Sequence, residues 1–94
     1  MTIFAEEILT TNASTPIQFS RTIYDVMGGT RAARAIVVVK SQPIFYGFIS
    51  TPTALNGYKA VADQEIEING YDNIRNFMAL AQATAGTIYV NYLN

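Results

Sequence analysis

The sequence predicts an all-β fold: a single small β-sandwich or jelly-roll-like domain with one short helical turn near residues 72–76. Six or seven short segments rich in Ile, Val, Thr, Tyr and Phe follow one another, separated by turn residues such as Pro52 and Asn56-Gly57. A chain of 94 residues suits one domain. The chain has no Cys and no His, so stability must come from packing or from association with other chains.

The first 15 residues are predicted to form an N-terminal arm or edge segment, and residues 16–94 the β-sandwich domain. Residues 1–9 are compatible with a helix, a strand or a docking arm, and residues 10–15 with a polar linker or turn. After Pro16, alternating apolar residues predict a strand over residues 17–24. Residues 27–30 contain two adjacent glycines and are predicted to form a turn or a mobile loop.

The middle of the chain predicts two extended segments, a loop and a further strand. Residues 35–39 are a continuous β-branched run, which suits a central strand covered on both faces. Residues 44–49 resume extended structure, with Gly47 marking a bulge or a close approach, and residues 50–57 form a loop. Over residues 65–68, alternation places two isoleucines inward and Glu65 and Glu67 outward.

Near the end of the sequence, Asp72 can cap a helical turn that runs towards Phe77. Periodicity leaves residues 78–84 open between strand and helix. The strand is favoured because Ala85-Gly86 resembles a hairpin tip before residues 87–93, whose apolar and polar residues alternate.

The residues for most catalytic chemistry are missing from this sequence. Without His or Cys, the commonest general base, thiol nucleophile and transition-metal ligands are absent. Glu65 and Glu67 could form a carboxylate pair, or a cation site with Asp63, but a solvated strand face is the simpler interpretation. Residues 28–31 lack the spacing of a phosphate-binding loop. We therefore expect no enzyme activity, no catalytic residue, no cofactor and no metal site.

Charge and hydropathy bound the partners. Six Lys and Arg face seven Asp and Glu without forming a basic stripe, so we expect no nucleic-acid binding. No apolar run approaches the roughly 20 residues of a membrane span, and no basic segment precedes the apolar residues near Met1, so we expect no membrane insertion and no signal peptide. Eleven Phe and Tyr are many for one thin core, which favours protein–protein contact. A carbohydrate-binding module using Tyr46, Tyr58, Tyr71 and Tyr89 is the alternative.

From Ala33 onward the sequence resembles a group of small bacteriophage virion structural proteins, the capsid decoration or cement proteins. The matching blocks are Ala35-Ile36-Val37-Val38-Val39, Gln42-Pro43-Ile44 with Tyr46, Thr51-Pro52-Thr53-Ala54 with Gly57, Ile66, Ile68 and Gly70, Asp72-Asn73-Ile74 with Phe77, and residues 87–93. The chain departs from the pattern at Phe45 and at residues 47–49, where charged or polar residues are more usual.

The resemblance implies a β-sandwich subunit that binds and stabilises a viral shell as a homo-oligomer, with a trimer favoured by the threefold sites of such shells. Its partners would be the major capsid protein or other virion proteins, and it would reside in the virion after assembly in the host cytoplasm. A tail, neck or head-fibre component is the alternative within the same class. For the contacts we expect apolar side chains buried between subunits, with the candidates Ile3, Phe4, Phe45, Phe48 and Tyr58.

Overall fold

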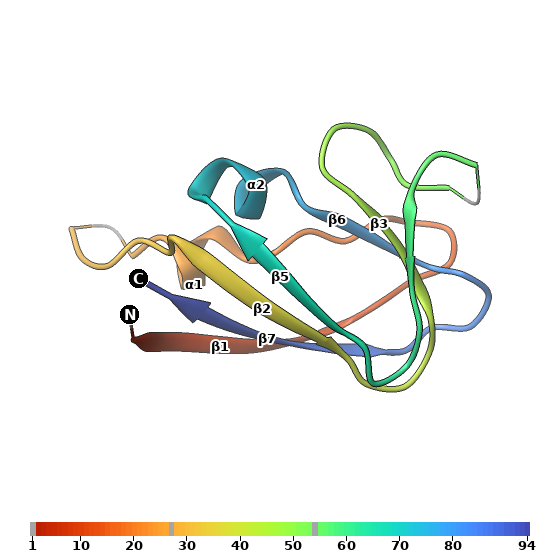
Figure 1. The fold of residues 1–94 in the computed structure, drawn as a ribbon, viewed down its shortest axis with the longest axis horizontal. Coiled ribbons are helices and arrows are strands. Elements are labelled where there is room, and N and C mark those ends of the chain that lie inside the picture. The colour runs from red at the N-terminus through yellow and green to blue at the C-terminus, as the bar shows by residue number, and fades with distance from the viewer. Residues whose placement is uncertain (1, 27, 54) are drawn as a thin grey trace.

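The computed structural model describes residues 2–26, 28–53 and 55–94, and their strands form two packed antiparallel sheets (Figure 1). The first sheet has the order β1-β7-β2-β5 and the second has the order β4-β3-β6. The strands are β1 (Ile3–Thr10), β2 (Arg34–Val39), β3 (Ile44–Gly47), β4 (Tyr58–Ala60), β5 (Glu65–Asn69), β6 (Met78–Ala81) and β7 (Thr87–Leu93). The predicted small all-β sandwich is confirmed.

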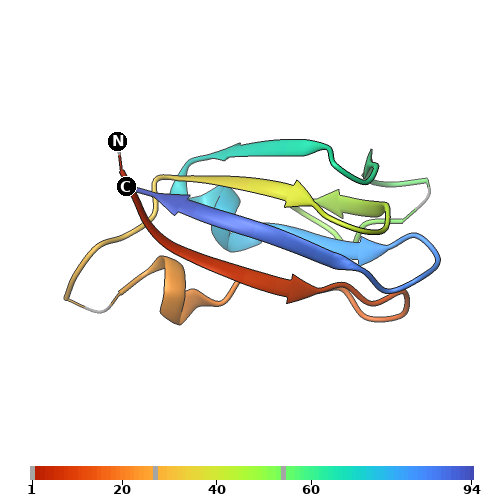
Figure 2. The same ribbon diagram turned by 90° about the horizontal axis from the view of Figure 1, so that it is seen from below.

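The core lies between the two sheets. Figure 2 looks onto the broad face of the four-stranded sheet, with the strands of the smaller sheet behind it. Ile88, Val90 and Tyr92 alternate inward along β7, which lies between β1 and β2. Phe77 belongs to the same buried cluster and stacks on Phe19, with ring centroids 4.6 Å apart, and Phe19 meets Tyr92 edge to face at 5.6 Å. Aromatic packing therefore supplies much of this thin core.

One carboxylate is buried beside this core. Glu7 on β1 is 9% exposed and accepts hydrogen bonds from the Tyr92 hydroxyl and, at 2.9 Å, from the Ser20 backbone N–H. Tyr92 is fully buried, and burial, followed by its hydrogen bond to Glu7, raises the pKa of its hydroxyl far above the ordinary range. The Tyr92–Glu7 bond thus ties β1 to β7 from inside the sandwich.

The strand predicted over residues 17–24 is wrong. Ile17 forms a short bridge to Ala79 at the edge of β6, and the chain then turns into helix α1 (Arg21–Tyr24). The backbone N–H groups of Ile23 and Tyr24 donate to the Ser20 carbonyl. Local helical bonds replace a strand ladder here because both Phe19 and Tyr24 enter the core, which an alternating strand with this five-residue spacing would not allow.

Helix α2 (Tyr71–Asn76) confirms the predicted helical turn but corrects its cap. The helix begins one residue before Asp72, after Gly70 with φ of +94°, so Asp72 lies in the first turn rather than at the cap. Asp72 and Arg75 form an i, i+3 ion pair at 4.0 Å on the exposed surface. No helix among the described residues is long and apolar enough to cross a membrane.

Residues 78–81 are a strand, as favoured, but the predicted hairpin at Ala85-Gly86 is wrong. β6 pairs with β3, whereas β7 pairs with β1 and β2, so residues 82–86 cross from one sheet to the other. Gly86 is fixed at the crossing by the Thr11 backbone and hydroxyl. A Cβ atom there would lie 2.7 Å from the Gln42 Cβ, so the backbone passes close to its neighbour, a role that glycine also serves outside turns.

Strand β2 is central, as predicted, but only one of its faces is fully covered. Ala35, Val37 and Val39 point into the core and are fully buried. Ile36 and Val38 lie on the outer face of the four-stranded sheet and are half-buried. The prediction of cover on both faces is therefore wrong for the chain on its own, because the sandwich has two layers and β2 belongs to one of them.

The two ends of the described chain meet. The Asn94 backbone N–H donates to the Thr2 carbonyl at 3.2 Å, and the Thr2 N–H donates to the Asn94 side-chain oxygen at the same distance. Figures 1 and 2 both show the N and C ends side by side, at the end of the sandwich away from the β3–β4 loop.

Candidate functional site

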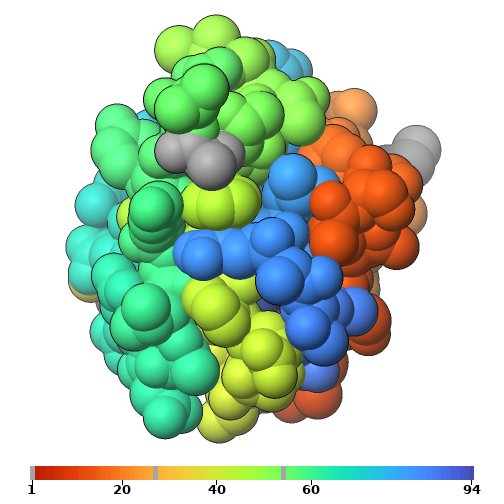
Figure 3. Space-filling model, turned by 90° about the vertical axis from the view of Figure 1, so that its right-hand side faces the viewer, coloured from red at the N-terminus to blue at the C-terminus, as the bar shows by residue number. Residues whose placement is uncertain are grey.

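An uncharged apolar loop connects β3 to β4 and stands out from one end of the sandwich. Ile49 and Leu55, on the two sides of this loop, are 97% and 99% exposed. Figure 3 shows the loop in green, projecting at the top of the view. The sequence carries no charged residue from Ser41 to Tyr58. We call Ile49, Leu55 and the flanking Phe48 and Tyr58 the tip.

The loop that bears the tip has internal structure. The Thr53 hydroxyl accepts hydrogen bonds from the backbone N–H groups of Leu55 and Asn56, at 3.2 and 3.0 Å, in a Ser/Thr turn. The Asn56 side-chain amide donates to the Ser50 hydroxyl at 3.1 Å, which links the two arms of the loop. Pro52 is fully buried beneath them. These bonds hold Ile49 and Leu55 in an outward position.

Aromatic contacts join the tip to the core. Phe48 packs on Phe77 at 5.8 Å between ring centroids, and Tyr58 packs on Tyr46 at 5.4 Å. Tyr46 also contacts Phe77, at 5.8 Å. A shallow hollow lies between the two arms of the loop and is lined by the four tip residues together with Ser50 and Asn56. The tip is therefore an exposed apolar extension of the buried aromatic cluster.

A second apolar surface lies on the outer face of the four-stranded sheet. The strand register places Ile8, Tyr89 and Val38 side by side across β1, β7 and β2. Ile8 is 68% exposed, and a groove runs past it between Tyr89, Thr87 and Lys40. We call Ile8, Val38, Lys40, Thr87 and Tyr89 the outer groove.

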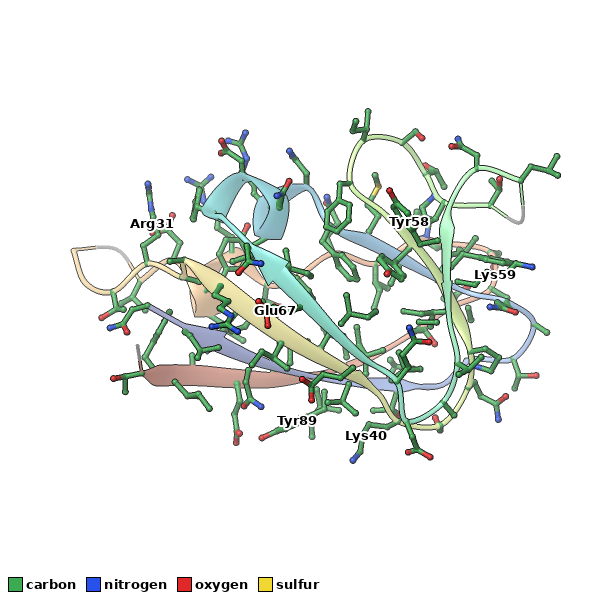
Figure 4. All side chains as sticks on the ribbon, in the orientation of Figure 1. Arg31, Lys40, Tyr58, Lys59, Glu67 and Tyr89 are labelled. Carbon is green, nitrogen blue, oxygen red and sulfur yellow. The ribbon has the colours of Figure 1, made fainter. Side chains whose placement is uncertain are left out.

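Polar groups flank the outer groove. Tyr89 donates its hydroxyl hydrogen bond to the Glu6 carboxylate, and this bond is the main cause that raises the pKa of Tyr89. Glu65 on β5 is the register neighbour of Val38. Figure 4 shows Tyr89 and Lys40 along the lower edge of the molecule, whereas Tyr58 lies near the tip on the upper side.

The five predicted contact residues lie at different places. Ile3 is half-exposed at the start of β1, and Phe4 is partly buried against the core. Phe45 lies on the outer face of the smaller sheet, in the register row of Lys59 and Leu80. Only Phe48 and Tyr58 meet, at the tip.

Sequence reasoning missed Ile49, Leu55 and Ile8 as contact residues. A signal for Leu55 exists in the sequence: it lies in the uncharged 50–57 loop, so no predicted strand buries its side chain. Ile49 gave no such signal, because it stands at the end of the extended segment predicted over residues 44–49. The indication in the sequence that Ile8 is exposed is weaker, since residues 1–9 are compatible with a helix, a strand or a docking arm, and the direction of the Ile8 side chain differs between them.

The acidic residues singled out in the sequence have structural roles or face solvent. Glu65 and Glu67 are exposed on the outer side of β5, as predicted. Glu67 pairs with Arg34 at 2.5 Å and also accepts from Asn69, and the Arg34 hydrogen bond lowers the pKa of Glu67. Within residues 2–26, 28–53 and 55–94, no group of three His, Cys, Asp or Glu could hold a metal ion.

The tyrosines proposed as a sugar-binding platform do not share a face. Tyr58 belongs to the tip and contacts Tyr46, whereas Tyr89 lies in the outer groove. Tyr71 donates to Asp25 at 2.6 Å, and the Arg31 guanidinium stacks on the Tyr71 ring at 4.1 Å. A flat stacking platform needs neighbouring rings, and this arrangement offers such a pair only at the tip.

Asp25 is the centre of a small ionic cluster beside α1. Arg21 and Arg31 lie 3.7 and 3.6 Å from its carboxylate. The Tyr71 hydrogen bond, followed by the charge of Arg31, holds the pKa of Asp25 below its usual value.

The glycine pair predicted as a turn lies in the loop between Asp25 and Arg31. Gly28 has φ of +74°, and the Gly29 N–H donates to the Val26 carbonyl. Met27, the first residue of that predicted turn, lies outside the described residues.

Comparison with known proteins gives no relative: no protein-family model, no curated protein and no solved structure matches this chain.

Proposed function

We propose that this protein is a non-enzymatic structural component of a bacteriophage particle that binds and stabilises the viral shell through protein contacts. The observation that carries the proposal is the tip, where Ile49 and Leu55 are held almost fully exposed on an uncharged loop. Exposing two aliphatic side chains on one loop is costly in water unless a partner covers them.

The proposed mechanism is burial of the tip against another virion protein. Burying an exposed Leu or Ile side chain contributes roughly 1.5–3 kcal/mol, so two of them with an adjacent tyrosine could anchor a contact. The near-neutral net charge of −1 gives little repulsion between copies packed at high density. The resemblance to decoration proteins supports the shell as the partner, with the major capsid protein or another virion protein offering the receiving surface.

Quantitative mass spectrometry of purified particles tests the proposal. In particles of the phage that encodes this chain, we expect the protein at a copy number comparable with that of the major capsid protein. Its absence from purified particles would overturn the proposal.

A pair of variants tests the role of the tip. Particles lacking the protein are incubated with purified wild type or with the Ile49→Ser/Leu55→Ser variant and then pelleted. We expect the wild type to sediment with the particles and the tip variant to remain in the supernatant. Val26→Ser removes another exposed aliphatic side chain, 45% exposed and outside the tip, and should sediment like the wild type. Equal sedimentation of all three proteins would show that the tip is not the docking surface.

A further inference from the structure

We propose that the tip of one copy docks in the outer groove of a second copy, so that the protein associates with itself head to tail. This inference deepens the proposed structural role and rests on it for the expectation of a homo-oligomer. The inference itself starts from two apolar surfaces of one chain, the tip and the outer groove.

The outer face of β2 carries apolar side chains that the chain itself leaves uncovered. Ile36 and Val38 are β-branched aliphatics on the outer face of a two-layer sandwich, where antiparallel strands normally show polar residues to water. Ile8 extends this apolar surface on the same register row and is 68% exposed. A third layer over this face would bury all three residues.

The tip and the outer groove match in shape and chemistry. Ile49 and Leu55 protrude, whereas the groove beside Ile8 and Tyr89 is concave. The tip loop is uncharged, so it can lie next to Lys40 without placing a like charge against that ammonium group. Its hydroxyl and amide groups, such as Ser50 and Asn56, can pair with polar groups of the groove.

A positive charge lies next to the tip, and a negative charge lies next to the outer groove. Lys59 follows the tip directly on β4 and is exposed. Glu65 borders the groove on β5, next to Val38, and is also exposed. The proposed contact is oriented so that Lys59 of one copy faces Glu65 of the next. Such complementarity sets orientation and disfavours the reverse docking.

The tip and the outer groove lie on different parts of the molecule. The tip belongs to the three-stranded sheet, whereas the groove lies on the outer face of the four-stranded sheet, and Figure 4 places Tyr58 and Lys40 on different sides of the molecule. The contact is therefore heterologous, and a pair of copies keeps one free tip and one free groove. Such contacts close into rings when the rotation between copies permits, and three copies would make a trimer.

Mixing two defective variants provides the test. The tip variant is Ile49→Ser/Leu55→Ser, and the groove variant is Ile8→Thr/Val38→Thr, which keeps residues that favour strands. By analytical ultracentrifugation, we expect the wild type to form a ring or a longer head-to-tail assembly. Each variant alone should raise the dissociation constant about a hundredfold or more, since it removes two apolar anchors.

An equimolar mixture of the two variants should form a heterodimer and nothing larger, because one intact tip and one intact groove remain. A mixture that stays monomeric, a closed twofold dimer of the wild type, or a monomeric wild type would overturn the head-to-tail contact. Val26→Ser is the matched control and should assemble like the wild type. Circular dichroism of each variant identifies a loss of folding.

Charge reversal gives a second route that leaves the apolar anchors intact. Lys59→Glu and Glu65→Lys should each weaken self-association, and an equimolar mixture of the two should recover a pair with opposite charges at the rim. Failure of the mixture to recover any association would contradict the proposed orientation. A monomeric protein that is abundant in purified particles would overturn this inference alone, whereas an assembling protein that is absent from particles would overturn the proposed function alone.

Discussion

Replacing Tyr92 by phenylalanine should destabilise this protein through one buried hydrogen bond. Tyr92 is fully buried and its hydroxyl donates to the Glu7 carboxylate, which is itself 9% exposed. The variant keeps the ring and the Ser20 N–H that donates to this carboxylate, but it removes the hydroxyl donor. Leaving a buried acceptor short of a partner costs about 1–3 kcal/mol, and more when the group is charged.

The loss should be visible in thermal unfolding. For a domain of this size, each kcal/mol lowers the melting temperature by about 4–8 °C, so Tyr92→Phe should melt roughly 5–20 °C below the wild type. Urea unfolding followed by circular dichroism gives the free energy directly, with an unchanged slope if the fold is kept.

Tyr89→Phe is the matched control. It removes a hydroxyl from the same strand, β7, and the lost hydrogen bond also goes to a glutamate of β1, but that bond lies on the exposed face. Water can replace the lost partner there, so the loss in stability should be well under half of that for Tyr92→Phe. Equal losses for the two variants would refute the reasoning that burial decides the cost.

The pH dependence of Tyr92 adds a second check. Burial raises its pKa above the ordinary value near 10, so the unfolded chain ionises this tyrosine before the folded chain does. The stabilising contribution is therefore complete below pH 10 and is lost as the pH rises further. The stability difference between the wild type and Tyr92→Phe should narrow above pH 10.

Three further substitutions test the close backbone approach at Gly86, the ionic cluster around Asp25 and the aromatic core around Phe77. Gly86→Ala should lower the free energy of unfolding by about 1–3 kcal/mol in urea, because the new methyl group would meet Gln42 at 2.7 Å. Tyr71→Phe should raise the pKa of Asp25 towards its usual value in an NMR titration, because it removes the hydrogen bond that contributes most to lowering that pKa. The stability that the ionised Asp25 gives the folded protein is present above the usual aspartate pKa and is lost as the pH falls through the lowered pKa of the folded state. Phe77→Ala should cost about 3–5 kcal/mol in urea, because it leaves a cavity among the core rings.

Each of these three has a result that would contradict it. Wild-type stability of Gly86→Ala would mean that the segment over residues 82–86 can move away from Gln42 without loss of stability. An unchanged titration of Asp25 would leave its arginine partners as the cause of the low pKa. Phe45→Ala is the control for Phe77→Ala, since its ring lies on the outer face of the smaller sheet, and it should cost less.

The strands with the simplest patterns could be predicted from the sequence. The continuous run of β2, and the alternation of β5 and β7, follow from how the two faces of a strand are buried. Local pattern could not reveal the partner of each strand. Ala85-Gly86 has the composition of a hairpin tip, yet β6 and β7 belong to different sheets, because Gly86 allows the backbone to pass close to Gln42.

The candidate site was predictable in kind but not in position. Aromatic excess and low charge indicate a contact surface, and Phe48 and Tyr58 were identified as candidates. Ile49 and Leu55 were missed because the direction of an aliphatic side chain at the end of a strand or in a loop depends on long-range packing, which local pattern does not show. Here the turn at Thr53 and the buried Pro52 fix that direction.

The pairing of β1 with β7 has a consequence for how the chain acquires its structure. β7 is the neighbour of both β1 and β2, so until β7 has been synthesised β1 has no partner strand and β2 has only β5. Such high contact order slows folding, since distant segments must meet before their interactions can compensate for the lost chain entropy. Because Thr2 and Asn94 lie within hydrogen-bonding distance, a short peptide could join them and turn the β1–β7 pair into a local hairpin. A circular permutant opened at an exposed loop would then nucleate its main sheet from neighbouring residues.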